Sequence, residues 1–145
     1  MIFFPRFSIK TMTFVISIIF TLAFISLLVY NYSKAEQNDF TWNCSLFELQ
    51  NKYYPRLRYS YQFWRIPISA IFHSNILHFV LNVLGLQIYG YFVEWYLGKK
   101  KLICLFCWSI VLGHLLSCLA FPTSISTTSS SILSAILTMK AYFFF

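Results

Sequence analysis

The feature that most constrains the fold is a run of twenty residues, 11–30, that contains no charged side chain. A helix of about 20 apolar residues is long enough to cross a hydrocarbon core of roughly 30 Å. The whole sequence is 59% hydrophobic and 21% aromatic with only 10% charged residues, and is thus more apolar than a typical soluble domain. We therefore expect an integral membrane protein whose first membrane-spanning helix covers residues 11–30.

A cleavable secretory signal is the alternative interpretation of this run, because Arg6 and Lys10 form a basic region before it. The uninterrupted length of the run and the lack of a small-x-small cleavage site favour an uncleaved anchor.

Two further apolar segments, 71–98 and 102–121, and a fourth that begins near Ser129 predict more spans. The expected fold class is all-α, a polytopic transmembrane helical bundle with four visible spans. The expected organisation is a short N-terminus, a first helix, an outer interfacial loop and a partial helical core, which occupy residues 1–10, 11–30, 31–66 and 67–145 respectively.

The basic residues predict the orientation in the membrane. Short cytoplasmic connections are enriched in Lys and Arg, and Arg6, Lys10 and the run 99–101 stand in segments without acidic residues. We expect both segments in the cytoplasm and residues 31–66 outside or in a lumen, where the triplet at 43–45 fits a glycosylation acceptor. The formal charge of +7 is divided among membrane edges, so the expected partner is the lipid bilayer and no nucleic acid.

Polar residues interrupt the second apolar segment at His73, His78, Asn82 and Glu94. A charged side chain at the centre of a bilayer costs about 2.5 to 3.5 kcal/mol, so such groups usually face a cavity or a partner. His78 and Asn82 are four residues apart and share one helix face. They are candidates for a functional site, and structural hydrogen bonding between helices is the alternative interpretation.

Hydroxyl side chains gather at residues 124–131, where the third span has returned to the outer side and the fourth begins. A helix that starts there presents unpaired backbone N–H groups, which suit an anionic oxygen. A serine beside those groups and faced by His78 and Asn82 fits acyl transfer with an oxyanion hole. An ordinary helix cap is the alternative.

In continuous register, this part of the chain resembles the rhomboid family of intramembrane serine proteases. The residues that carry the resemblance are Trp64-Arg65, Phe72-His73, His78, Asn82, Gly90, Glu94 and Gly98. The resemblance implies hydrolysis of peptide bonds in or near the transmembrane helices of protein substrates, with neither a metal nor another cofactor. It implies that Ser129 is the nucleophile, with Ser130 as the runner-up, and that His78 and Asn82 line the oxyanion site. The implied structural motif consists of Trp64, Arg65, His73, Glu94 and Gly98.

The sequence departs from the family pattern in two ways. Thr127 and Ser130 stand where the family has glycines beside the nucleophile, and no histidine follows His114 to match the general base of the family's sixth helix. We therefore expect further helices after Phe145 in an active form, and no cleavage by these 145 residues alone. For His114, a core position with a bond to a neighbouring carbonyl is favoured over a role as substitute base.

The alternative function is a catalytically inactive relative that binds transmembrane helices for trafficking or degradation. A small transporter or channel is a weaker third interpretation, because the polar groups cluster at one end. Cys104 and Cys107 have the spacing of a redox or metal pair, but no second pair follows, so we expect them at apolar core positions.

Overall fold

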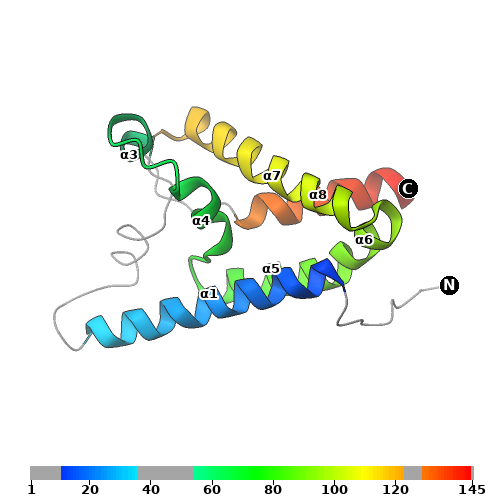
Figure 1. The fold of residues 1–145 in the computed structure, drawn as a ribbon, viewed down its shortest axis with the longest axis horizontal. Coiled ribbons are helices and arrows are strands. Elements are labelled where there is room, and N and C mark those ends of the chain that lie inside the picture. Colours follow the sequence, from blue (N-terminus) through cyan, green and yellow to red (C-terminus); the bar gives the residue numbers. More distant parts are fainter. Residues whose placement is uncertain (1–10, 36–53, 123–128, 145) are drawn as a thin grey trace.

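The computed structural model describes residues 11–35, 54–122 and 129–144, which form a bundle of helices with no strand among them (Figure 1). In chain order the helices are α1 (Met12–Ala35), α3 (Tyr54–Tyr59), α4 (Arg65–Ile71), α5 (Ile76–Gly85), the π-helix η1 (Leu86–Gly90), α6 (Tyr91–Leu97), α7 (Lys99–Ala120) and α8 (Ser129–Phe144). The all-α class expected from the sequence is confirmed. Residues 1–10, the triplet at 43–45 and the hydroxyl residues among 124–128 lie outside the described part.

Three helical segments are long and apolar enough to cross a membrane: Met12–Ser33, Ile76–Leu97 and Lys99–Ala120. They correspond to the first three expected spans. The expected fourth span corresponds to α8, whose 16 described residues are fewer than the about 20 that cross a hydrocarbon core.

The second span begins five residues later than the apolar pattern indicates, and this boundary of the prediction is wrong. Helix α4 ends at Ile71, the backbone of Phe72 is extended, and α5 starts only at Ile76. Asn75 causes the late start, because its side chain accepts a hydrogen bond from the backbone N–H of His78 and caps the helix. His73 therefore lies in a loop before the span.

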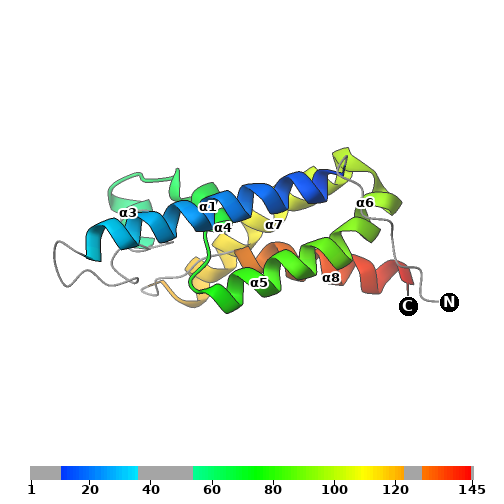
Figure 2. The same ribbon diagram turned by 90° about the horizontal axis from the view of Figure 1, so that it is seen from below.

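Helix α8 has the central position in the bundle, since it contacts α4, α5, η1, α6 and α7 (Figures 1 and 2). Two glycines allow this close packing. A Cβ atom on Gly113 of α7 would lie 2.6 Å from Cβ of Ser131, and one on Gly85 of α5 would lie 2.5 Å from a methyl carbon of Leu133. Glycine at these two places thus sets how closely α5 and α7 approach α8.

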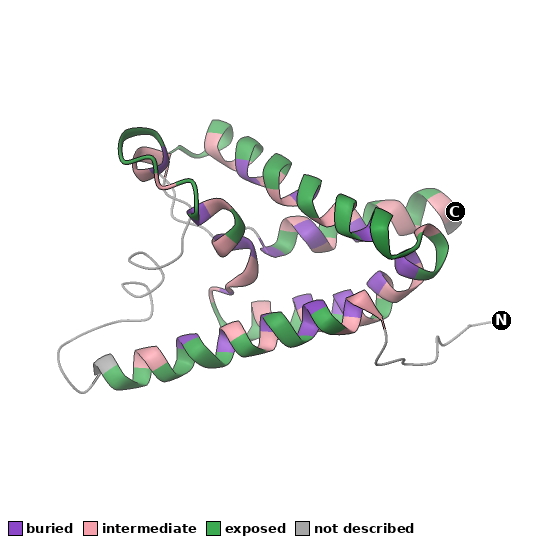
Figure 3. Ribbon diagram, viewed as in Figure 1, coloured by how far each residue is buried: buried purple, intermediate pink, exposed green. Residues whose placement is uncertain are grey.

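Burial in the bundle is distributed as in a protein surrounded by lipid. The outer sides of α1 and α7 are exposed along most of their length (Figure 3), although they consist largely of Leu, Ile and Val. The buried residues include nearly as many polar as apolar side chains. The polar members are Thr13, Ser17, Arg65, Ser69, His73, Asn82, Glu94, Ser109, His114 and Ser129. In a chain with membrane-spanning helices, polar side chains are less costly inside the bundle than facing lipid.

Candidate active site

Ser129 is the first residue of α8, and its side chain is fully buried. Its Oγ lies 3.5 Å from Nε2 of His78 on α5. Ser130 is exposed instead, and its backbone carbonyl accepts a hydrogen bond from the Ser134 hydroxyl. Of the two candidate nucleophiles, the structure therefore brings only Ser129 to the His78 ring.

The His78 ring is held between two hydroxyl groups. Nδ1 lies 3.1 Å from Oγ of Ser74, while Nε2 faces Ser129. If the Ser74 hydroxyl donates to Nδ1, the ring carries its proton on Nε2 and directs an N–H group towards Ser129. Sequence reasoning did not single out Ser74, although its i to i+4 spacing from His78 is visible in the sequence.

Asn82 lies one helical turn after His78 and is buried. Its side-chain amide donates a 2.7 Å hydrogen bond to the backbone carbonyl of His78. An amide group has two N–H bonds, and this interaction uses one of them. His78 and Asn82 thus present side chains on one face of α5, as their spacing predicts, and the start of α8 lies against the His78 ring.

His73 is fully buried in the loop before α5, among aromatic rings. Its ring centroid lies 5.1 Å from that of Phe20, 5.4 Å from that of His78 and 5.5 Å from that of Phe79. Neither ring nitrogen has a hydrogen-bond partner among the described residues. Burial, together with the neighbouring His78, lowers the pKa of His73 from 6.5 to about 4, so the ring is neutral at pH 7.

Trp64 and Arg65 stand at the start of α4, and the Arg65 side chain is almost completely buried while Trp64 is half exposed. Arg65 Nε donates a 2.6 Å hydrogen bond to the side-chain oxygen of Gln62, and its guanidinium carbon lies 4.6 Å from the centre of the Trp64 ring. Burial lowers the pKa of Arg65, which remains a cation at neutral pH. Both residues shape the loop that leads into α4.

Glu94 lies at the other end of the bundle and is the only acidic residue in the described part of the chain. Its carboxylate accepts hydrogen bonds of 2.8 Å from the backbone N–H groups of Met12 and Thr13 and one of 2.6 Å from the Thr13 hydroxyl. It thereby caps the start of α1 from α6, where the helix dipole favours a negative charge. Gly98, with a φ of +80°, makes the tight connection from α6 to α7.

His114 of α7 is buried and has partners at both ring nitrogens. Nε2 lies 2.7 Å from the Ser69 hydroxyl of α4, and Nδ1 lies 3.2 Å from the backbone carbonyl of Ile110. The predicted bond to a neighbouring carbonyl is therefore present. Ser69 was missed by the sequence analysis, because 45 positions separate it from His114 and no local pattern connects them.

Cys104 and Cys107 are exposed on the outer side of α7, so the expectation that they occupy core positions is wrong. Helix α7 is apolar on all sides, and its sequence pattern therefore does not distinguish the face in contact with lipid from the face in contact with α8. Within residues 11–35, 54–122 and 129–144, no group of three or more His, Cys, Asp or Glu side chains is arranged to hold a metal ion.

Comparison with known proteins adds independent information to this geometry. Residues 60–145, more than half of the chain, match the rhomboid domain family. Rhomboid-like protease 3 of Toxoplasma gondii is 32% identical over 72 residues, which are 50% of this chain and 27% of that relative. The chain therefore spans about a quarter of the length of the curated relative that it matches. No solved structure matches the chain.

Proposed function

This chain belongs to the rhomboid family, and from that premise we propose that it acts as an intramembrane serine endopeptidase. It is a multi-pass membrane protein with a helical bundle fold. The proposed substrates are membrane proteins, which would be cleaved at peptide bonds in or near their transmembrane helices.

The observation that carries this proposal is the 3.5 Å contact between Ser129 Oγ and His78 Nε2 inside the bundle. In the proposed reaction, the Ser129 hydroxyl attacks the scissile carbonyl carbon, and negative charge develops on the carbonyl oxygen. An N–H group on His78 Nε2, the second amide N–H of Asn82 and the backbone N–H of Ser129 are the proposed donors to that oxygen. The start of α8 favours this charge, because its first N–H groups lack partners within the helix.

A general base is also needed, because a serine hydroxyl is a weak nucleophile at neutral pH. His114 does not fit this role, since both of its ring nitrogens have other partners. His73 is buried among aromatic rings, and its ring centroid lies 5.4 Å from that of His78. In the rhomboid family this role belongs to a histidine of the sixth helix, and the proposed reaction relies on a base of that kind.

Proteoliposomes provide the test, with the chain expressed from its complete reading frame together with a reporter whose transmembrane helix is readily unfolded. Ser129→Ala should lower cleavage at least about 10³-fold, as loss of a serine nucleophile does in hydrolases. Ser130→Ala is the matched control and should retain cleavage, because Ser130 is exposed whereas Ser129 is buried beside His78. Loss of activity only in Ser130→Ala would show that the assigned nucleophile is wrong.

A second candidate function is a catalytically inactive relative that binds transmembrane helices. Ser130 favours this inactive alternative, because it stands where the family has a glycine beside the nucleophile. Glycine allows backbone conformations and close approaches that a residue with a side chain does not. This alternative predicts that the reporter co-purifies with the protein but stays intact, and that Ser129→Ala changes neither result.

A further inference from the structure

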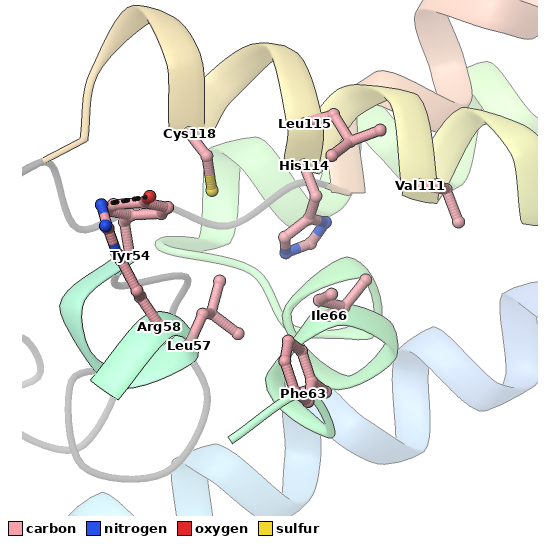
Figure 4. A pocket seen from close by; sticks show the side chains of 9 residues that line it. All are labelled: Tyr54, Leu57, Arg58, Phe63, Ile66, Val111, His114, Leu115 and Cys118. Atoms are coloured by element: carbon pink, nitrogen blue, oxygen red, sulfur yellow. Dashed lines mark hydrogen bonds between the residues drawn. The ribbon is translucent and has the colours of Figure 1, made fainter. Parts of the chain in front are cut away.

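A cavity lies away from Ser129, between α7 on one side and α3, α4 and their connection on the other (Figure 4). Its volume is about 410 Å³. Leu57, Phe63 and Ile66 form one wall, and Val111 and Leu115 of α7 form the other. Small-molecule sites typically have volumes of about 300 to 1,000 Å³ and mostly apolar walls, so this cavity is large enough to hold a ligand.

The two ends of the cavity differ chemically. Figure 4 shows the Arg58 guanidinium and the Tyr54 hydroxyl at the end near Cys118, while Val111 lies at the opposite end. Arg58 Nη1 donates a 3.3 Å hydrogen bond to the Tyr54 hydroxyl, and the Arg58 side chain is otherwise exposed. Helices α3, α4 and α7 contain no acidic residue, so the described helices around this end contribute only positive charge.

The dimensions of the cavity determine which occupant fits. Val111 and Cys118 are seven residues apart on α7, which is about 10 Å at 1.5 Å per residue. Along this length the walls are formed by apolar side chains, among them Leu57, Ile66 and Leu115. Such walls suit a hydrocarbon chain that lies parallel to α7.

We propose that this cavity binds one acyl chain of a membrane phospholipid and that Arg58 holds the phosphate of the same molecule. The surroundings supply such a ligand, because Val111 and Leu115 belong to a helix long and apolar enough to span the membrane. A guanidinium group pairs well with phosphate oxygens through two parallel N–H bonds. The bound chain would run along α7 from Cys118 towards Val111, with its headgroup beside α3.

The test uses the full chain in phosphatidylcholine vesicles that contain a trace of phosphatidylcholine with a photoreactive group in one acyl chain. Irradiation followed by peptide mapping should label α7 at the cavity wall. Leu115→Trp fills the cavity and should lower this labelling at least fivefold. Leu116→Trp is the matched control, since Leu116 is the neighbouring residue, does not line the cavity and is 66% exposed. Equal labelling of the two variants would identify ordinary contact with bulk lipid and overturn the proposal.

The role of Arg58 is tested with a photoreactive diacylglycerol that has the same acyl chains but no phosphate. Arg58→Gln should lower labelling by phosphatidylcholine several-fold and leave labelling by diacylglycerol unchanged. Arg56→Gln is the control on the same helix, because Arg56 does not line the cavity. If Arg58→Gln lowered labelling by both lipids to the same extent, phosphate recognition would be refuted. Loss of this labelling on addition of a free fatty acid, in an amount far below that of the phosphatidylcholine already in the vesicles, would refute the assignment to phospholipid.

Discussion

The hydroxyl oxygen of Ser129 lies 3.5 Å from Nε2 of His78, a residue 51 positions earlier in the chain. On the far side of the same ring, Nδ1 lies 3.1 Å from the Ser74 hydroxyl. The neutral ring can donate to an oxyanion only when its proton is on Nε2, and a hydrogen bond accepted by Nδ1 favours that tautomer. Ser74 is therefore a positioning residue for the proposed reaction.

Ser74→Ala should lower kcat about fivefold with little change in KM, because loss of one hydrogen bond costs about 1 kcal/mol. Steady-state cleavage of the reporter in proteoliposomes measures both constants. Ser74→Thr, which keeps the hydroxyl group, should restore kcat. Ser134→Ala removes an exposed hydroxyl from α8 and is the control. An unchanged kcat in Ser74→Ala would show that Ser74 does not orient the ring.

Glu94→Gln should destabilise the bundle by about 1.5 to 3 kcal/mol, because a neutral amide with one oxygen replaces a carboxylate that accepts three hydrogen bonds. Thr13→Val removes one of the three and should cost about 1 kcal/mol. Unfolding in detergent micelles measures both effects, and the double variant tests whether they are coupled. Additive effects of the two substitutions would contradict a shared contact.

Stability should decrease as the pH falls from about 6.5 to 4, because of His73. The unfolded chain takes up a proton near pH 6.5, whereas the folded protein takes it up only near pH 4. The contribution of His73 to the free energy of unfolding is therefore complete above pH 6.5. It decreases by about 3 kcal/mol between pH 6.5 and 4 and changes no further below pH 4. Thermal unfolding between pH 7.5 and 3.5 measures this profile.

His73→Phe should flatten the pH profile in this interval without a large loss of stability at pH 7.5. Phenylalanine has a similar shape and leaves no unpaired polar atom among the rings of Phe20 and Phe79. Ser74→Ala should retain the slope of the natural protein. The same slope in His73→Phe would assign the titration to another group, of which His78 is the nearest.

Gly113→Ala should destabilise the protein by about 1 to 3 kcal/mol, because its methyl group would lie 2.6 Å from Cβ of Ser131. It should also lower cleavage, since Ser131 is two residues after Ser129. The double variant Gly113→Ala/Ser131→Gly makes room again and should recover stability in the same unfolding assay. If the second substitution brings no recovery, the loss has a cause other than this overlap.

The start of α1 and the run Lys99–Lys101 should both face the cytoplasm. The contact of Glu94 with Met12 places the start of α1 at the same end of the bundle as α6, which is followed directly by this run. Tags at the N-terminus and after Ala35 should therefore differ in protease protection in sealed vesicles, and only the N-terminal tag should be accessible from the cytoplasmic side. If a tag after Ala35 were accessible from the cytoplasmic side, the orientation would be opposite to the predicted one.

Local patterns in the sequence were sufficient to predict the class of fold and part of the candidate active site. Uninterrupted apolar runs predict spanning helices because the thickness of the bilayer fixes their length. The four-residue spacing of His78 and Asn82 places both on one face of a helix whatever that helix packs against. The cap at Asn75 was also visible as a Ser-Asn pair before an apolar run, and it would have placed His73 in the loop.

The tertiary structure alone decided which polar groups meet. Glu94 caps a helix that begins 82 positions earlier, and Ser69 bonds to His114 across 45 positions. Helices α1 and α7 have apolar side chains all around, so hydrophobicity does not fix their rotation about their own axes. Close approach at Gly85 and Gly113 fixes how α5 and α7 pack against α8, with Ser129 buried against His78 and Ser130 exposed. Such rotations depend on side-chain packing between helices, which no segment of the sequence specifies by itself.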